Sequence, residues 1–223
     1  RGLDAGEIEE FARLYGETDR AFIRAGYGFS RSRNGAPNMH AVTCLPTVGG
    51  KWRYPGGGAI YAYFDLYHID MTLIEGRAAI DRSTRVLDQS RIGAVLTGDP
   101  RDLGDGPPVT ATLIQNTNPM AVAPESALVH AGFARDDLFV CVHEQFMTET
   151  ALMADIVLPA TTFLEHDDLY VSGGHSHLQI GPRVIEPFGE ARSNHDVIVA
   201  LAKRLGAEHE GFEMTAWEMI DRT

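Results

Sequence analysis

Leu138-Phe-Val-Cys-Val142 is a short apolar run, and two similar runs lie on either side of it, Val109-Thr-Ala-Thr-Leu-Ile114 and Ile156-Val-Leu158. Residues 124–131 and 148–154, which separate these runs, have the spacing of helices. Short buried strands that alternate with helices are typical of a parallel sheet covered on both faces. We therefore predict an α/β fold with three layers, in which helices cover both faces of a mostly parallel, Rossmann-like sheet.

Turn signals and helical spacing extend this prediction to the rest of the chain. The run Gly104-Asp-Gly-Pro-Pro108 is strong turn punctuation and marks an internal boundary. Helices are expected over residues 4–15, 37–48 and 193–206, and a strand over residues 21–25. Three segments are predicted: residues 1–65, the tail of one α/β domain with a glycine-rich loop; residues 66–108, an irregular connection; and residues 109–223, a Rossmann-like half-domain.

The two ends of the sequence lack the usual signals. The chain opens at Arg1 with no initiator Met and no signal-like segment. It stops at Thr223 after a helical pattern that has no Gly or Pro stop signal. We therefore expect the 223 residues to be a piece of a longer protein.

The composition limits the classes of function. The chain has 19 Lys+Arg against 31 Asp+Glu, and its net charge of −12 argues against nucleic acid as a partner. Hydrophobic residues make up 44% of the chain, and no apolar run approaches the roughly 18–20 residues of a membrane helix. The two cysteines, Cys44 and Cys141, cannot form a disulfide framework, and their apolar neighbours predict small buried side chains.

Polar residues follow each of the three apolar runs, at Gln115–Pro119, His143–Gln145 and Pro159–His166. Ligands of open parallel sheets bind outside the carboxyl ends of the strands. A nucleotide-like ligand at this edge would place Asn118 at a sugar or diphosphate oxygen and Glu144 at the N1 and N2 edge of guanine. The alternative is that these residue types simply end strands and cap helices, and the residues alone leave both interpretations open.

A glycine-rich loop at Gly26–Gly35 invites comparison with dinucleotide-binding motifs. Arg31 stands where the third glycine of G-x-G-x-x-G belongs, so an NAD fingerprint is weak here. Arg31 and Arg33 instead suit a pyrophosphate or another acidic group. The alternative is a solvated basic loop.

The histidines suggest a third interpretation, a metal-dependent hydrolase. His175 and His177 would share one face of an extended segment, and Glu165 could join them as a metal ligand. No zinc-site spacing is matched, however, so we predict no metal held by protein side chains.

Three signatures along the chain are similar to those of a known family. They are Gly26-Tyr-Gly-Phe-Ser-Arg-Ser-Arg-Asn-Gly35 with Pro55-Gly-Gly-Gly58; Asn116-Thr-Asn-Pro119; and Asp137-Leu-Phe-Val-Cys-Val-His-Glu-Gln-Phe-Met-Thr-Glu-Thr-Ala151 with Ala154-Asp-Ile-Val-Leu-Pro159, Glu165 and Gly189-Glu-Ala-Arg192. In their order and spacing, they resemble the central part of molybdopterin oxidoreductases of the dimethyl sulfoxide reductase superfamily.

The resemblance implies a bis(molybdopterin guanine dinucleotide) cofactor that carries molybdenum or tungsten and serves two-electron redox chemistry on a small substrate. Residues 109–223 would then be a guanosine-binding half-domain. Residues at matching positions are expected to contact the cofactor: Tyr27 and Arg31; Asn118 at a guanosine; His143 and Glu144, where an aspartate is usual; His166, where some nitrate reductases have a lysine; and Asp196, near the nucleotide.

The resemblance also implies what this chain does not contain. In family members, the protein ligand of the metal and any iron–sulfur cluster belong to other regions, so we expect the isolated chain to hold no metal and to be inactive. An electron-transfer subunit is compatible with the family, as is a bacterial cytoplasmic or periplasmic location. The alternative function is a non-catalytic scaffold that descends from such enzymes, like the large subunit of respiratory complex I.

Overall fold

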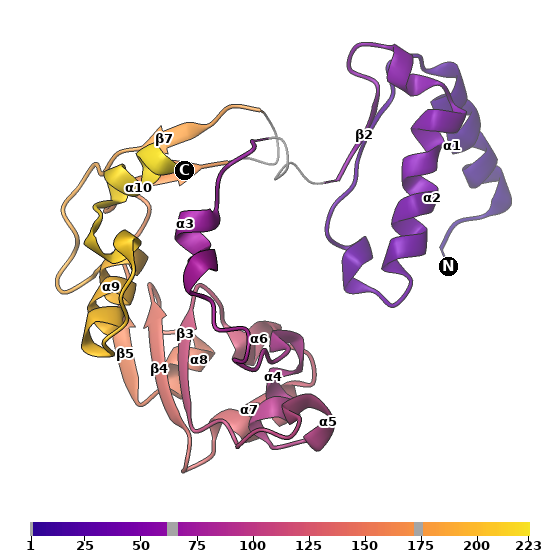
Figure 1. Cartoon of the computed structure of the whole chain (residues 1–223). Helices are drawn as coiled ribbons and strands as arrows, with labels where there is room; N and C mark the ends of the chain where they lie inside the picture. Colours follow the sequence, from indigo (N-terminus) through magenta and orange to yellow (C-terminus); the bar gives the residue numbers. More distant parts are fainter. Residues whose placement is uncertain (1, 62–66, 172–175) are drawn as a thin grey trace. The chain divides into compact units, whose positions relative to one another are not determined.

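The computed structural model describes residues 2–61, 67–171 and 176–223, and the contacts divide the chain into two compact units. The first unit comprises Arg1–Ile69 and Val171–Leu178, and the second comprises Asp70–Tyr170 and Gln179–Thr223. Figure 1 labels most of the helices and strands of both units.

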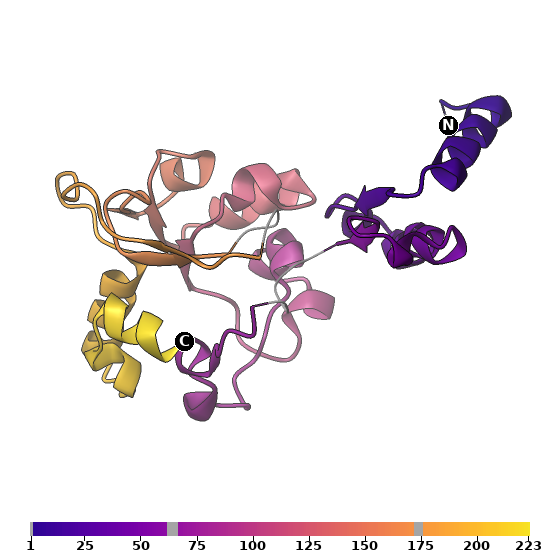
Figure 2. The same cartoon turned by 90° about the horizontal axis from the view of Figure 1, so that it is seen from above.

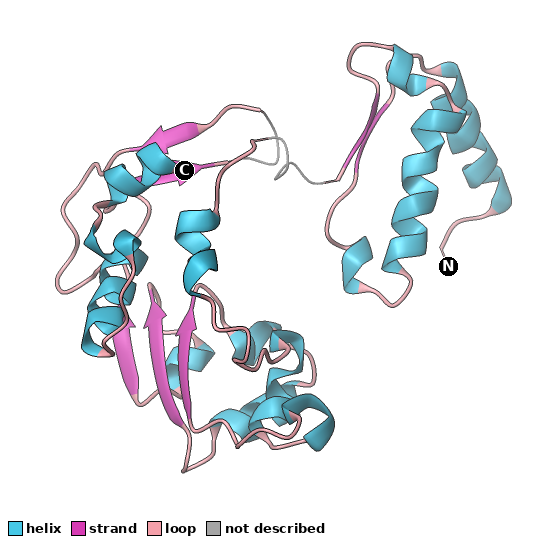
Figure 3. Ribbon diagram, in the orientation of Figure 1, coloured by secondary structure: helices cyan, strands magenta, loops and turns pink. Residues whose placement is uncertain are grey.

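In its described residues, the first unit contains two α-helices, two 3-10 turns and a two-stranded parallel sheet (Figure 3). The predicted helices and strand are confirmed, although the second helix begins at Gly35 rather than at residue 37. A Cβ atom at Gly35 would lie 2.0 Å from the carbonyl oxygen of Phe29, so only glycine fits there. The elements are α1 (Ala5–Glu17), β1 (Phe22–Arg24), the 3-10 turn η1 (Phe29–Arg31), α2 (Gly35–Val48), η2 (Lys51–Arg53) and β2 (Gly58–Ile60).

A buried lysine joins η2 to the end of α1. Lys51 is only 1% exposed, and its Nζ donates a hydrogen bond of 2.9 Å to the carbonyl oxygen of Gly16. The same ammonium lies 5.4 Å from the centre of the Tyr15 ring, close enough for a cation–π contact. Carbonyl and ring together compensate the charge of a lysine that water does not reach.

The second unit begins with short helices and continues with alternating strands and helices (Figure 3). Its elements are α3 (Thr72–Glu75), η4 (Arg77–Ala79), η5 (Gln89–Arg91), α4 (Ile92–Leu96), α5 (Pro100–Leu103), β3 (Ala111–Gln115), α6 (Pro119–Val122), α7 (Ser126–Phe133), β4 (Phe139–Glu144), α8 (Glu149–Leu152), β5 (Ile156–Pro159), β6 (Asp168–Tyr170), β7 (Gln179–Gly181), α9 (Asn194–Arg204), η6 (Glu210–Glu213) and α10 (Ala216–Arg222).

Strands β3, β4 and β5 form a parallel sheet in that order, which confirms the α/β prediction. In its register, Leu113 lies beside Cys141, and Cys141 lies beside Ile156. A second pair, β6 and β7, is antiparallel, and Figure 2 shows its two segments side by side.

One face of the parallel sheet packs on helices and forms the core. Its buried residues are Leu96, Ile114, Val129, Phe133, Leu138, Val140, Val142 and Ala151. Helices α4 and α7 approach closely because Gly93 has no Cβ atom. A Cβ atom there would lie 2.6 Å from the backbone nitrogen of Val129. Leu96 comes from α4, inside the segment that the sequence predicts to be an irregular connection.

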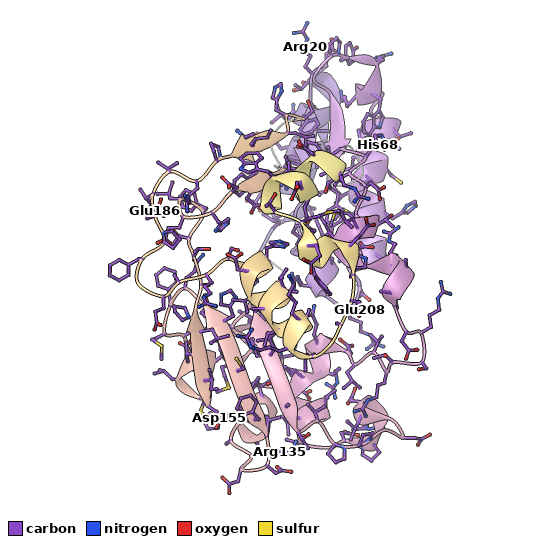
Figure 4. The ribbon with its side chains drawn as sticks, turned by 60° about the vertical axis from the view of Figure 1, so that its left-hand side comes forward. Arg20, His68, Arg135, Asp155, Glu186 and Glu208 are labelled. Atoms are coloured by element: carbon purple, nitrogen blue, oxygen red, sulfur yellow. The ribbon has the colours of Figure 1, made fainter. Side chains whose placement is uncertain are left out.

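The opposite face of the sheet is covered only in part. Helix α9 lies near the carboxyl ends of the strands (Figures 1 and 4) and buries Val197. Toward the other end of the strands, Leu113, Phe139 and Ile156 point to this face and are 41%, 47% and 45% exposed. Among the described residues, no helix is both long and apolar enough to cross a bilayer.

Candidate functional site

The carboxyl ends of the three parallel strands meet at one edge of the second unit. Gln115, His143 and Leu158 lie side by side in the register of the sheet. Because parallel strands all end at this edge, the polar loops that follow them are brought together. Arg135 and Asp155 mark the other end of the strands in Figure 4.

His143 links the end of β4 to its neighbours on both sides. Its Nε2 lies 3.1 Å from the carbonyl oxygen of Arg192, and its Nδ1 lies 3.0 Å from Nε2 of Gln115. A carbonyl oxygen can only accept, so Nε2 carries the proton and Nδ1 accepts from the Gln115 amide. The ring is 2% exposed and both nitrogens have partners, so His143 connects the end of β4 to β3 and to the Arg192 backbone. The part that His143 was predicted to play in cofactor binding stays a prediction.

The carbonyl of Arg192 extends the sheet beyond β5. It accepts a hydrogen bond of 3.1 Å from the backbone N–H of Thr161, and Ala160 and Arg192 form a parallel bridge. The side chain of Gln145 donates to the carbonyl of Thr161 at 2.9 Å. In the sequence, Arg192 is only the end of a family signature, and no contact is predicted for it, since nothing local signals that its carbonyl pairs with a residue far along the chain.

Asn118 lies at the start of α6, and its side chain contacts the start of α8. The Asn118 amide donates to Glu149 at 2.8 Å, while its Oδ1 accepts from the hydroxyl of Thr150 at 2.7 Å. The hydrogen bond from Asn118 lowers the pKa of Glu149. No role was predicted for Thr150, because a threonine inside a predicted helix carries no signal of the partner that its side chain contacts.

Glu144 presents a carboxylate at the same edge. It is half-buried, and its Oε1 accepts the backbone N–H of Gln145 at 2.7 Å. Within the part of the chain that the structure describes, no hydrogen bond reaches its other oxygen. An acceptor with one free oxygen therefore stands where the sequence predicts contact with guanine.

His166 and Asp196 extend this edge on two further segments. The Nδ1 of His166 lies 2.8 Å from the hydroxyl of Thr161, and its Nε2 lies 3.6 Å from the carboxylate of Asp168. Asp196 is exposed in the first turn of α9 and accepts a hydrogen bond from Ser193 at 2.8 Å.

Helix α9 begins beside the loop that follows β3. The side chain of Asn194 donates to Asn116 at 3.3 Å, and Asn116 has a positive φ of 57°. Asn tolerates this left-handed conformation better than most residues, so the residue type at position 116 fits its backbone conformation.

Tyr27 and Arg31 belong to the first unit. Tyr27 is 51% exposed and packs edge-on against Tyr61, with ring centres 5.4 Å apart. Arg31 ends η1 and is exposed, and its guanidinium has no hydrogen bond or ion pair to any residue that the structure describes. The structure thus places five of the seven predicted residues, Asn118, His143, Glu144, His166 and Asp196, in one unit and these two in the other.

Glu165, the carboxylate of the metal-site alternative, has structural partners. Its oxygens accept the backbone N–H groups of Thr162 at 2.7 Å and Phe188 at 2.6 Å, which lower the pKa of Glu165. His175 lies outside the described residues. Among the residues that are described, no three His, Cys, Asp or Glu side chains gather as a metal site.

The prediction that both cysteines are buried is wrong, since Cys44 and Cys141 are each partly exposed. Each cysteine lies on a part of its helix or strand that is not fully covered. Cys44 lies on α2 with its Sγ 3.7 Å from Nε2 of His40, and Cys141 points to the partly covered face of the sheet. Burial nevertheless raises the pKa of the Cys141 thiol.

Comparison with known proteins identifies the family of this chain. A family model of molybdopterin oxidoreductases matches residues 10–204. The chain is 38% identical to "Probable oxidoreductase YoaE" of Bacillus subtilis, over 92% of this chain and 29% of that protein. It is 28% identical to trimethylamine-N-oxide reductase of Haemophilus influenzae, over 94% of this chain and 28% of that protein.

The fold also matches a solved structure. Acetylene hydratase from Pelobacter acetylenicus superposes with a TM-score of 0.67 and 22% identity, over 95% of this chain and 33% of that chain. This chain therefore spans a third or less of the length of these relatives. The family model covers most of the 223 residues, and the resemblance seen in the sequence is confirmed. The chain belongs to the molybdopterin oxidoreductase family.

Proposed function

We propose that this chain is the central cofactor-binding part of an oxidoreductase that uses bis(molybdopterin guanine dinucleotide) with molybdenum or tungsten. When bound, that group supplies two-electron redox chemistry on a small substrate. Relatives named as reductases and the share of their length that the chain spans support the proposal. The metal ligand would then lie in the rest of the protein, and an electron-transfer subunit would be a separate partner.

The observation that carries the proposal is the set of hydrogen-bonding groups at the carboxyl edge of the sheet. Guanine presents two neighbouring donors, N1–H and the N2 amino group, which a carboxylate can accept. Glu144 offers an oxygen with no partner among the described residues. We propose that Glu144 accepts these donors, while the link from His143 to Arg192 keeps the end of β4 in place.

The remaining predicted residues would contact other parts of the cofactor. In the first unit, Arg31 offers an exposed guanidinium that suits a phosphate, and Tyr27 offers an exposed ring. In the second unit, His166 and Asp196 are accessible at least in part. These contacts are part of the proposal.

Calorimetric titration of the full 223-residue chain with GDP and ADP tests the guanosine site. We expect GDP to bind more tightly than ADP, because adenine lacks the two adjacent donors. Glu144→Gln should weaken GDP by about ten- to a hundredfold, the size expected for hydrogen bonds to a charged group, and leave ADP unchanged. Equal and weak binding of both nucleotides by the unmodified chain would contradict the proposal and favour a scaffold without cofactor.

A further inference from the structure

Thr150 is fully buried although its side chain is polar, and both of its hydrogen-bonding functions are used. The hydroxyl accepts the backbone N–H of Met120 at 3.1 Å. Since that N–H can only donate, the single hydroxyl proton is free to go to Oδ1 of Asn118, 2.7 Å away. The backbone N–H of Thr150 donates to the same Oδ1 at 3.3 Å.

These contacts fix which way the Asn118 carboxamide faces. A backbone N–H must meet an acceptor, so the carboxamide oxygen faces Thr150 and the amino group faces Glu149. One amino hydrogen is donated to Glu149 at 2.8 Å. The second has no partner among the residues that the structure describes. Asn118 can therefore only donate to a ligand.

Glu149 complements this donor. Its carboxylate is exposed, and Oε2 accepts from Asn118. The backbone N–H of Glu149 itself also donates to the carboxylate, and no other described residue donates a hydrogen bond to Oε1. Because the hydrogen bond from Asn118 lowers its pKa, Glu149 is charged at neutral pH. One free donor and one free charged acceptor thus stand side by side at the carboxyl edge of the sheet.

We propose that Asn118 and Glu149 together bind the 2′ and 3′ hydroxyls of a ribose, with Thr150 as the residue that positions Asn118. A ribose diol carries hydroxyl protons that a carboxylate accepts and oxygens that an amide N–H reaches, and carboxylates bind ribose hydroxyls in other nucleotide sites. The proposal rests on the proposed function, since the ribose would be that of the guanosine, but it adds Glu149 and Thr150 to the site.

The test compares GDP with 2′,3′-dideoxy-GDP on the full chain by calorimetry. We expect the unmodified chain to bind GDP about tenfold more tightly than the dideoxy compound. Glu149→Gln should lower the affinity for GDP to that for the dideoxy compound and leave the latter unchanged. Glu208→Gln removes another exposed carboxylate of the same unit and should change neither affinity.

Thr150 is tested by a pair of variants. Thr150→Val keeps the shape and removes the hydroxyl, so the preference for GDP over the dideoxy compound should be lost. Thr150→Ser keeps the hydroxyl and should restore that preference. A purely structural role would lower the melting temperature in both variants and leave the preference intact.

Two failures can be told apart. If the unmodified chain binds GDP and dideoxy-GDP equally well, or if Glu149→Gln keeps the preference, the ribose proposal is overturned and the guanine site stands. If the unmodified chain binds neither compound, the proposed function fails, and the ribose site fails with it. Since Glu149 is exposed, its variant decides the question even if Thr150→Val does not fold.

Discussion

At the scale of single residues, two histidines in similar sequence positions have different surroundings in the structure. His143 and His166 both follow or end a strand, yet His143 is buried with two partners and His166 is partly accessible. The difference comes from Arg192, whose carbonyl lies against the ring of His143. A contact between residues so far apart along the chain has no local sequence signal, so the hydrogen bond between His143 and Arg192 could not be predicted.

The two cysteines provide a test at this scale. Burial raises the pKa of Cys141, which lowers its thiolate fraction at neutral pH, whereas Cys44 lies beside an imidazole on the surface of α2. We expect iodoacetamide at pH 7.5 to label Cys44 before Cys141, as followed by peptide mass spectrometry.

Cys44→Ser leaves Cys141 as the only thiol of the chain and should react more slowly than Cys141→Ser. Equal labelling rates for the two single variants would contradict the assignment.

At the scale of elements, periodicity predicted the helices and strands well. Helices α1, α2, α7 and α9 and strands β3, β4 and β5 lie where the spacing of apolar residues places them. The antiparallel pair of β6 and β7 was not predicted, since its strands are short and mostly exposed or half-buried. Asn118 and Glu144 were predicted as site residues because they follow or end strands, but Thr150 depends on the packing of α8.

The contact between α4 and α7 depends on glycine. At Gly93, an alanine Cβ would meet backbone atoms of α7 at 2.6 Å and 2.9 Å, and backbone cannot rotate away. We expect Gly93→Ala to destabilise the second unit by about 1–3 kcal/mol, the usual range for overpacking, as measured by urea unfolding.

Gly16→Ala is the matched control, because Gly16 lies within α1 with no atom near the added Cβ. It should be neutral or slightly stabilising, by about 0.5–1 kcal/mol. A Gly93→Ala variant as stable as the unmodified chain would show that the helices are not in tight contact.

Glu165 makes the loops after β5 sensitive to acid. Backbone N–H groups of Thr162 and Phe188 hold its pKa below the ordinary value of glutamate. A carboxylate whose pKa is lower in the folded state than in the unfolded state stabilises the fold when it is charged. This contribution is fully present above the unfolded-state pKa, and it is lost as the pH falls through the folded-state pKa. The melting temperature of the unmodified chain should therefore fall as the pH drops below the ordinary pKa of glutamate, about 4.5.

Glu165→Gln should have a lower melting temperature at pH 7 and a flatter dependence below pH 4.5, as followed by circular dichroism. The exposed Glu186, labelled in Figure 4, provides the control. If Glu165→Gln follows the same acid profile as Glu186→Gln, then Glu165 does not contribute to acid sensitivity.

At the scale of the whole molecule, the acidic balance and the proposed ligand are compatible. A net charge of −12 opposes binding of a polyanion, but one dinucleotide needs only a few placed donors, such as the Arg31 guanidinium and backbone N–H groups. The chain belongs to the molybdopterin oxidoreductase family and matches relatives three times its length or more.

The central claim is that the protein of which this chain is a part carries a molybdopterin guanine dinucleotide. The direct measurement is to purify the whole protein, oxidise it, and assay pterin fluorescence together with released GMP. We predict that both signals appear, with molybdenum or tungsten in the same preparation. Absence of both pterin fluorescence and GMP would contradict the proposed cofactor and favour a scaffold that has lost it.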